Sequence, residues 1–232
     1  MKAATGDQHS VVHQMARDLV EMLVISTKGR RSALALFVIL IYLLLGELLA
    51  PGFTNYWGFH VTQIAVILMT VLALETAFHR DGGLSWPTHL LIAVIAAADV
   101  LGTSEDLYHT FDLYDKLIHF ASGATAAAVT YDILGVLHRR QNITLSSGKR
   151  LAAAVMISFL VAGLGWEAYE HYGDMLFGTN RVQSRLDTIH DLSSNICGSM
   201  LAASVLWVRE SFGREAHRPA PVSSQRYEPP DR

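Results

Sequence analysis

Residues 33–50 have the sequence ALALFVILIYLLLGELLA, in which Glu47 is the only charged residue. An α-helix needs about 20 mostly apolar residues to cross a bilayer, so this stretch is long enough to span one. Pro51 and Gly52 follow directly and favour an end to the helix. The stretch therefore predicts a membrane-spanning helix.

Further apolar blocks follow along the 232-residue chain, at residues 60–78, 88–103, 115–137, 151–172 and 187–208. Hydrophobic residues make up 51% of the chain and charged residues only 17%, against roughly 25% in a typical soluble domain. We therefore predict an all-α fold class: a polytopic membrane protein with a bundle of six transmembrane helices, residues 32–209. The pattern in residues 1–31 fits either an amphipathic interfacial helix or a frayed tail, and residues 210–232 are expected to be a disordered tail.

The positions of lysine and arginine predict how the bundle is oriented. With both termini in the cytoplasm, only three of the 18 basic residues, Lys116, Arg181 and Arg185, fall on the outer side. Cytoplasmic loops are enriched in Lys and Arg, so this topology fits a bacterial cytoplasmic (inner) membrane, with the lipid bilayer as the chain's immediate partner.

Composition also excludes several functions. The net charge of -3 gives no basic field for nucleic acid, and the single cysteine, Cys197, allows no intrachain disulfide. We expect Cys197 to lie packed among small residues, and the isolated histidines His60 and His109 to lie at the surface.

Ionisable residues gather at one end of the last three blocks. Asp115 and His119 are four residues apart and share one helix face, and the next block repeats this spacing with Glu167 and His171. The last block begins with a polar stripe at steps of four: Asp187, Asp191 and Asn195. Because these three blocks alternate in direction, the stripes are expected at the same depth, close to the outer interface.

Ionisable groups inside a membrane usually face a protein interior or a cavity. Four roles remain open for this set. It could hold a divalent metal such as Zn, Mn or Fe, with His119, Glu167, His171, Asp187 and Asp191 as ligands. It could perform acid/base catalysis, form a proton or cation path, or be a purely structural polar network.

Two stretches in this region resemble a known family. DLYDKLIHFASGATAAA (112–128) and WEAYEHYGDMLFGTNRVQSRLDTIHDLSSNICGSMLAA (166–203) resemble the YjdF-type bacterial inner-membrane proteins, and more distantly the VanZ-like family. The matching positions are Asp115, Lys116, His119, Phe120, Glu167, Glu170, Arg185, Asp187, Asp191, Asn195 and Gly198. The resemblance implies a helical inner-membrane fold and, for VanZ-like members, a link to glycopeptide-antibiotic tolerance. It implies no particular reaction.

The leading hypothesis is an enzyme acting on a lipid-linked or cell-envelope substrate that enters from the outer leaflet. In it, His119, Glu167, Asp187 and Asp191 bind a metal or handle protons. Lys116 and Asn195 orient the site, and Arg185 and Arg181 either bind an anionic part of the substrate or counter the charge of the acids. The alternatives are a proton- or cation-coupled small transporter and a catalytically silent membrane scaffold.

Overall fold

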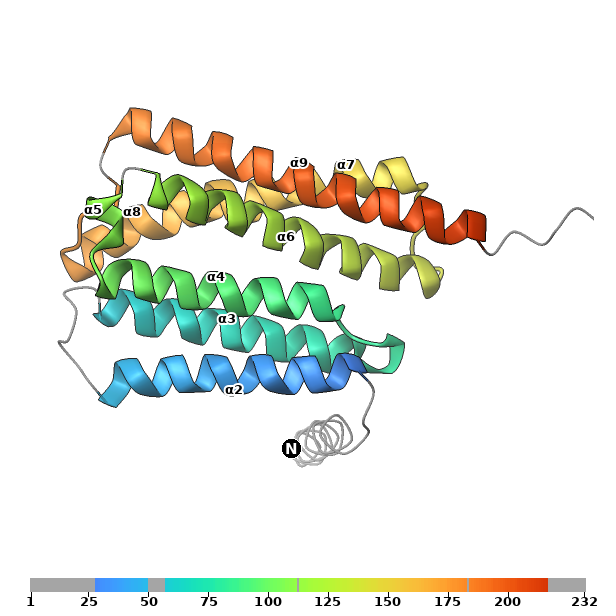
Figure 1. Cartoon of the computed structure of the whole chain (residues 1–232), viewed down its shortest axis with the longest axis horizontal. Helices are drawn as coiled ribbons and strands as arrows, with labels where there is room; N and C mark the ends of the chain where they lie inside the picture. Colours follow the sequence, from blue (N-terminus) through green and yellow to red (C-terminus); the bar gives the residue numbers. More distant parts are fainter. Residues whose placement is uncertain (1–27, 50–56, 112, 183, 217–232) are drawn as a thin grey trace, which may run out of the picture.

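The structure, a computed structural model, describes residues 28–49, 57–111, 113–182 and 184–216. Within these ranges the chain is helical apart from short connections, and none of it forms a strand (Figure 1). The predictions for the two tails fall for the most part on residues 1–27 and 217–232, outside the described residues.

The described helices follow one another in a simple order. They are α2 (Lys28–Leu49), α3 (Trp57–Phe78), η1 (His79–Asp81), α4 (Trp86–Ser104), α5 (Leu107–Thr110), α6 (Tyr114–Arg139), α7 (Ser147–Ser158), η2 (Phe159–Leu164), α8 (Gly165–Phe177) and α9 (Arg185–Ala216). The last of these continues to Ala216, past the predicted end of the sixth block at residue 208.

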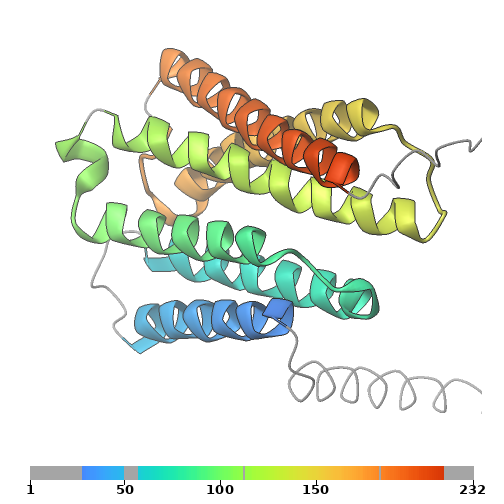
Figure 2. The same cartoon turned by 45° about the vertical axis from the view of Figure 1, so that its right-hand side comes forward.

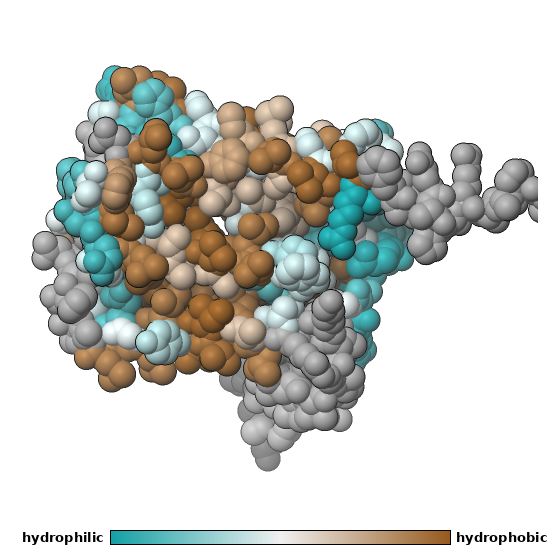
Figure 3. All heavy atoms as spheres, in the orientation of Figure 1, coloured by the Kyte–Doolittle hydropathy of each residue, from teal (hydrophilic) through white to brown (hydrophobic). Residues whose placement is uncertain are grey.

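Five stretches of the described chain are long and apolar enough to cross a membrane: Ser32–Leu49, Trp57–Phe78, Trp86–Ser104, Tyr114–Arg139 and Ser147–Phe177. They coincide with the first five predicted blocks, which confirms a helical membrane protein. α9 is longer than any of the other helices, but its polar stripe keeps it out of this set. Hydrophobic residues cover the middle of the visible face, and hydrophilic residues gather toward its two ends (Figure 3).

The helices form two groups. α2 packs against α3 and α4, and an apolar core that includes Leu36, Leu40, Ile64 and Ile92 fills the space between them. α6 packs along α9 and α7, and α4 joins the two groups by packing against α6 (Figures 1 and 2). The connections α4–α5–α6 and α8–α9 meet at one end of the bundle, where the polar stripes also begin.

The backbones of α6 and α9 touch at two glycines. A Cβ atom added to Gly123 would overlap the backbone carbonyl of Asn195, and one added to Gly198 would overlap the carbonyl of Phe120. Small residues allow this close approach of helices in lipid, where no hydrophobic effect drives association. The contact brings the polar stripes of the two helices face to face.

Two buried serines reinforce this contact. The hydroxyl groups of Ser158 and Ser199 lie 2.7 Å apart, and both donate to the carbonyl oxygen of Gly123, at 2.9 and 3.1 Å. Both side chains are fully buried. This layer connects α6, α7 and α9 through hydrogen bonds that have no water to compete with them.

A π-helical turn, η2, lies within the span that α7 begins and α8 completes. Gly163 in this turn leaves room for Phe159 and for Leu192 of α9, whose side chains lie 3.2 and 3.3 Å from the position of an added Cβ. Turns of this kind within α-helices are rare and frequently occur at functional sites. Here the turn immediately precedes the acidic helix α8.

Two expectations for single residues are wrong. His60 is fully buried rather than at the surface, because its Nδ1 lies 3.2 Å from the Glu47 carboxylate on the neighbouring helix. Cys197 is exposed rather than packed, because Gly198 and Asn195 occupy the face of α9 that meets α6. His109 is exposed, as expected.

Gly198→Ala is expected to lower the melting temperature, because its methyl group would overlap the Phe120 carbonyl and push α6 and α9 apart. Overpacking of this kind destabilises by about 1–3 kcal/mol. Gly46→Ala is the matched control, since nothing lies within 4 Å of its added Cβ. Thermal unfolding of the purified protein in detergent measures both variants; equal melting temperatures would contradict the close approach.

Candidate functional site

Lys116 is at the centre of a cluster of carboxylates at the α5 end of the bundle. Its Nζ atom lies 2.8 Å from Asp115 on α6, and 2.5 and 2.8 Å from Asp187 and Asp191 on α9. The sequence produces this arrangement because Asp187 and Asp191, one turn apart, extend from the start of α9 toward the start of α6. Asp191 is almost fully buried, so its charge depends on the lysine for compensation.

His119 lies one turn deeper, between the same carboxylates. Its Nε2 atom is 3.5 Å from Asp115 Oδ1 and 3.9 Å from Asp191 Oδ1. On the other side of the ring, Asn195 Nδ2 lies 3.0 Å from His119 Nδ1 and 3.2 Å from the Asp191 carbonyl oxygen. Both histidine and asparagine are buried.

Asn195 determines which ring nitrogen of His119 carries the proton. A backbone carbonyl only accepts hydrogen bonds, so the atom of Asn195 that faces the Asp191 carbonyl has to be the amide nitrogen. The same nitrogen donates to His119 Nδ1, which therefore accepts. In the neutral ring the proton is then on Nε2, directed toward Asp115 and Asp191.

Two groups of donor atoms lie close enough together to hold a metal ion. In the first, donors of Asp115, His119 and Asp191 all lie within 4.8 Å of one another, and in the second the same holds for His119, Glu167 and Glu170. Imidazole and carboxylate suit Zn, Mn or Fe. However, the Lys116 ammonium already contacts Asp115 and Asp191, and the preferred tautomer of His119 puts a proton where the first group would need a lone pair.

Arg181 holds a second cluster beside the first. Its guanidinium donates through Nε to Glu170 of α8 and through Nη2 to Asp99 of α4, both at 3.0 Å. It also lies over the rings of Phe59 and Tyr108, at 4.6 and 4.9 Å from their centroids. Arg181 thus connects α3, α4, α5 and α8.

Burial and the neighbouring charges set the protonation states of two members of this cluster. Burial, reinforced by the Asp99 carboxylate, raises the pKa of Tyr108 well above its usual range, so the phenol stays protonated and donates to Asp99. Burial, the largest single effect, would lower the pKa of Arg181, but the Asp99 and Glu170 carboxylates and the other neighbouring groups together more than offset it, and the pKa lies well above its usual range. Arg181 is therefore a permanent cation.

The loop after α8 is shaped to direct Arg181 inward. Gly178 ends α8 with a φ of 68°, a left-handed conformation that glycine adopts without strain. The Asp174 carboxylate accepts the backbone N–H of Arg181 at 2.9 Å and that of Val182 at 3.0 Å. It also accepts the Thr179 hydroxyl at 2.5 Å. These hydrogen bonds to Asp174 fix the backbone of the loop, and the Arg181 side chain is directed into the cluster.

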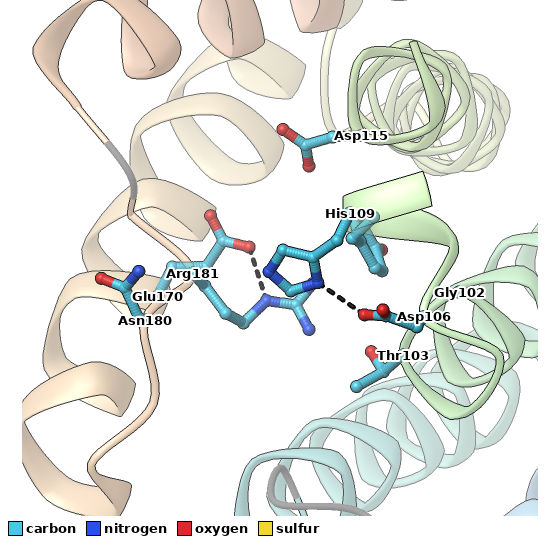
Figure 4. Close-up of a pocket in the computed structure, with 9 residues that line it drawn as sticks. Gly102, Thr103, Asp106, His109, Asp115, Glu170, Asn180 and Arg181 are labelled. Carbon is cyan, nitrogen blue, oxygen red and sulfur yellow. Dashed lines mark hydrogen bonds and ion pairs between the residues drawn. The ribbon is translucent and has the colours of Figure 1, made fainter. Parts of the chain in front are cut away.

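A small cavity of about 40 Å³ separates the two clusters. Asp115 lies on one side of it, and Glu170 and Arg181 lie on the other (Figure 4). His109 and Asp106, 2.6 Å apart, line it near α5. A polar cavity of this size holds one or a few water molecules. The two clusters therefore border one small cavity with room for water.

Negative charge exceeds positive charge across this region. Six carboxyl groups face the two cations Lys116 and Arg181; they belong to Asp99, Asp115, Glu167, Glu170, Asp187 and Asp191. Among the described residues, Glu167 Oε1 and Asn195 Oδ1 are buried and have no hydrogen-bond partner. Buried oxygens of this kind can accept a cation or a hydrogen-bond donor of a polar ligand.

The structure brings most of the sequence-predicted residues together. Lys116, His119, Asp187, Asp191 and Asn195 form one contact network, and Glu167 lies within reach of His119. The remaining three lie apart from the network. His171 is exposed, with its ring against Tyr172 at 5.8 Å between centroids; Arg185 is exposed at the start of α9; and Arg181 is held by carboxylates.

The sequence patterns missed the Arg181 cluster as a unit. Asp99 and Tyr108 are its least expected members, because they come from a different part of the chain than the polar stripes. An acid deep in an apolar block, as Asp99 is, was the available signal.

Arg181→Met is expected to destabilise the protein strongly, because it leaves Asp99 and Glu170 buried without a cation. Removing one partner of a buried ion pair costs about 3–5 kcal/mol. Thermal unfolding in detergent checks this, with Arg185→Met as the exposed control. Adding Asp99→Asn and Glu170→Gln to Arg181→Met should restore part of the lost melting temperature. Equal melting temperatures of Arg181→Met and Arg185→Met would contradict the assignment of Arg181 as a buried ion-pair partner.

Comparison with known proteins identifies the family. Residues 32–211 match the family described as "Predicted membrane protein (DUF2238)", which covers all the described helices that build the site. No curated protein and no solved structure matches the chain. The matched region covers well over half of the chain, and the chain therefore belongs to the DUF2238 family of membrane proteins.

Proposed function

We propose that the chain is a membrane-embedded enzyme that performs proton-transfer chemistry on a lipid-linked or cell-envelope substrate in a bacterial inner membrane. The observation that carries the proposal is the arrangement of His119. Its Nδ1 atom is fixed by Asn195, and its Nε2 atom is directed at Asp115 and Asp191. An imidazole oriented in this way, beside carboxylates in a largely dry site, is suited to general acid/base catalysis.

Each neighbour has a part in this proposal. Asp115 and Asp191 exchange protons with His119, and Asn195 keeps the ring in one orientation and one tautomer. Lys116 offsets part of the negative charge of Asp115 and Asp191, and Asp187 helps to hold its ammonium group in place. Glu167, within reach of the same imidazole, is the second carboxyl group that could give or receive a proton.

The membrane setting is part of the proposal. α9 has 32 residues, or about 48 Å at 1.5 Å per residue, and packs along α6, so it serves as the sixth span. Arg139, Arg140, Lys149 and Arg150 lie at the end of the bundle remote from the site, which favours a cytoplasmic location for that end and for both termini. The site would then open at the outer leaflet.

This placement favours a substrate with a lipid anchor. A site at the depth of the outer interface can receive a head group while its chains stay in the bilayer. Arg185, exposed at the first residue of α9, is the basic residue positioned to hold an anionic group, whereas Arg181 is committed to Asp99 and Glu170. The resemblance to YjdF-type and VanZ-like proteins is consistent with envelope chemistry and suggests no reaction.

A metal-dependent version remains an alternative. His119, Glu167 and Asp191 would supply ligands, joined by Asp115 or Glu170, and the metal would acidify a water molecule. The contacts of Lys116 favour the metal-free version, because its ammonium is already shared by three carboxylates.

A proton- or cation-coupled transporter is the second candidate, and the π-helical turn η2 is the observation that favours it. Below the Ser158–Ser199 layer, however, the fully or almost fully buried side chains of Ala127, Ala154 and Ala203 form an apolar layer, and a path would have to cross it to reach the next buried polar side chains of α6, Thr130 and Tyr131. If the chain is instead a catalytically silent scaffold, the His119 and Asp191 variants described next should not change the lipid composition of the envelope.

His119→Ala and Asp191→Asn are expected to abolish function, because each removes one side of the proposed proton transfer. In cells that lack the chain, an envelope lipid or lipid-linked intermediate should accumulate and be measurable by mass spectrometry of membrane lipids. Wild-type chain and His190→Ala, an exposed control on α9, should reverse the accumulation. Full reversal by His119→Ala at equal membrane abundance would refute the catalytic role.

Elemental analysis of the purified protein separates the two chemical versions. The proton-transfer version predicts equal, near-zero contents of Zn, Mn and Fe in the wild type and in His119→Ala/Asp191→Ala. A stoichiometric metal that is lost in the double variant would replace it with the metal-dependent version.

A further inference from the structure

A second and larger cavity lies at the opposite end of the bundle. Its volume is about 850 Å³, within the range of about 300–1,000 Å³ found for small-molecule sites. Its walls come from the turn before α4, the second half of α6, the start of α7 and the end of α9, which meet at this end (Figure 1). Nothing in the proposed chemistry uses this space.

Two arginine side chains converge in this cavity over a glycine. A Cβ atom added to Gly135 would lie 3.5 Å from Nη1 of Arg139 and 3.8 Å from Nη1 of Arg150. All three residues line the cavity. Two like charges brought this close repel each other unless an anion lies between or beside them.

Arg150 is held rigidly in this position. It is only 7% exposed, it pairs with Glu210 of α9, and its guanidinium lies 5.3 Å from the centroid of the Tyr131 ring. Tyr131 in turn donates its hydroxyl to Glu210. Arg150 Nε is buried and has no hydrogen-bond partner among the described residues. The arginine is thus oriented in advance and retains an unused donor.

The acids near the cavity are already engaged. Asp132 accepts the Ser85 backbone N–H at 2.8 Å and the Thr88 hydroxyl at 2.7 Å. Asp81 pairs with Arg140. Among the described residues no carboxylate pairs with Arg139, whose Nη2 donates to the backbone carbonyl of Asp81 at 3.4 Å. Arg139 is therefore a cation of the cavity that no carboxylate pairs with among the described residues, while neutral donors satisfy Asp132.

The start of α7 adds further donors. Ser146 and Ser147, at the N-terminus of this helix, line the same cavity. The first N–H groups of a helix have no partner within it, and together with the helix dipole they favour an anion. Neither serine nor helix end would make a site alone, but here they adjoin the two guanidinium groups.

We propose that this cavity binds a phosphate group, held by Arg139, Arg150 and the N-terminus of α7. The phosphate belongs either to the head group of an anionic phospholipid or to a soluble phosphate compound. Basic pockets between membrane helices are typical sites for anionic head groups. Gly135 leaves room for the phosphate because any side chain there would occupy the space between the arginines.

Calorimetric titration of the purified full chain in detergent tests the proposal. The probes are inorganic phosphate and dihexanoylphosphatidylglycerol below its micelle concentration. The wild type should bind at least one of them saturably, and Arg139→Gln and Gly135→Val should each weaken binding about tenfold or more. Lys149→Gln is the matched control, since this exposed basic residue next to Arg150 does not line the cavity.

The results separate the two sources of phosphate. Binding of the lipid but not of inorganic phosphate supports a head-group site, and comparable binding of both supports a site for soluble phosphate. Absence of saturable binding of either probe to the wild type overturns the proposal. It is also overturned if Arg139→Gln binds as the wild type does, or if Lys149→Gln loses as much affinity as Arg139→Gln.

Discussion

The direct contact between the backbones of α6 and α9 is the constraint on which the site depends. Gly123 meets the carbonyl of Asn195, and Gly198 meets that of Phe120, so no side chain separates the two helices at this depth. One turn above Gly123, His119 is therefore forced beside Asn195. In a bilayer this association relies on packing and hydrogen bonds rather than on the hydrophobic effect, and the Ser158–Ser199 layer supplies both.

The charges above this contact form one connected system. Lys116 is shared by Asp115, Asp187 and Asp191, and Arg181 is shared by Asp99 and Glu170. Because the two clusters border one small cavity, a proton gained by any carboxylate changes the energy of all the others. This electrostatic coupling between the two clusters is consistent with the proton transfer proposed for His119.

The sequence predicted the parts of this arrangement that depend on a single helix. Length and apolar composition identified five spans, and four-residue spacing placed His119, Asp191 and Asn195 on facing stripes. Patterns within one helix do not predict which side chains of two helices far apart in the sequence will pair. Arg181 binds Asp99, 82 residues earlier. The sequence left open whether this arginine counters the acids or binds an anionic group of a substrate, and it did not indicate Asp99 as the partner. His60 was misplaced for the same reason, since its partner Glu47 lies on another helix.

The π-helical turn at Phe159–Leu164 has a consequence for the geometry of the acidic half of its span. A π turn accommodates one residue more than an α turn, and one residue corresponds to about 100° of rotation about the helix axis. Without that extra residue, α7 could keep its packing while Glu167 and Glu170 would point away from His119 and Arg181. The turn thus sets the rotation of α8 relative to α7 about their common axis. Deleting one residue from the turn would shorten the span only slightly, but it would turn the two glutamates away from the charged clusters.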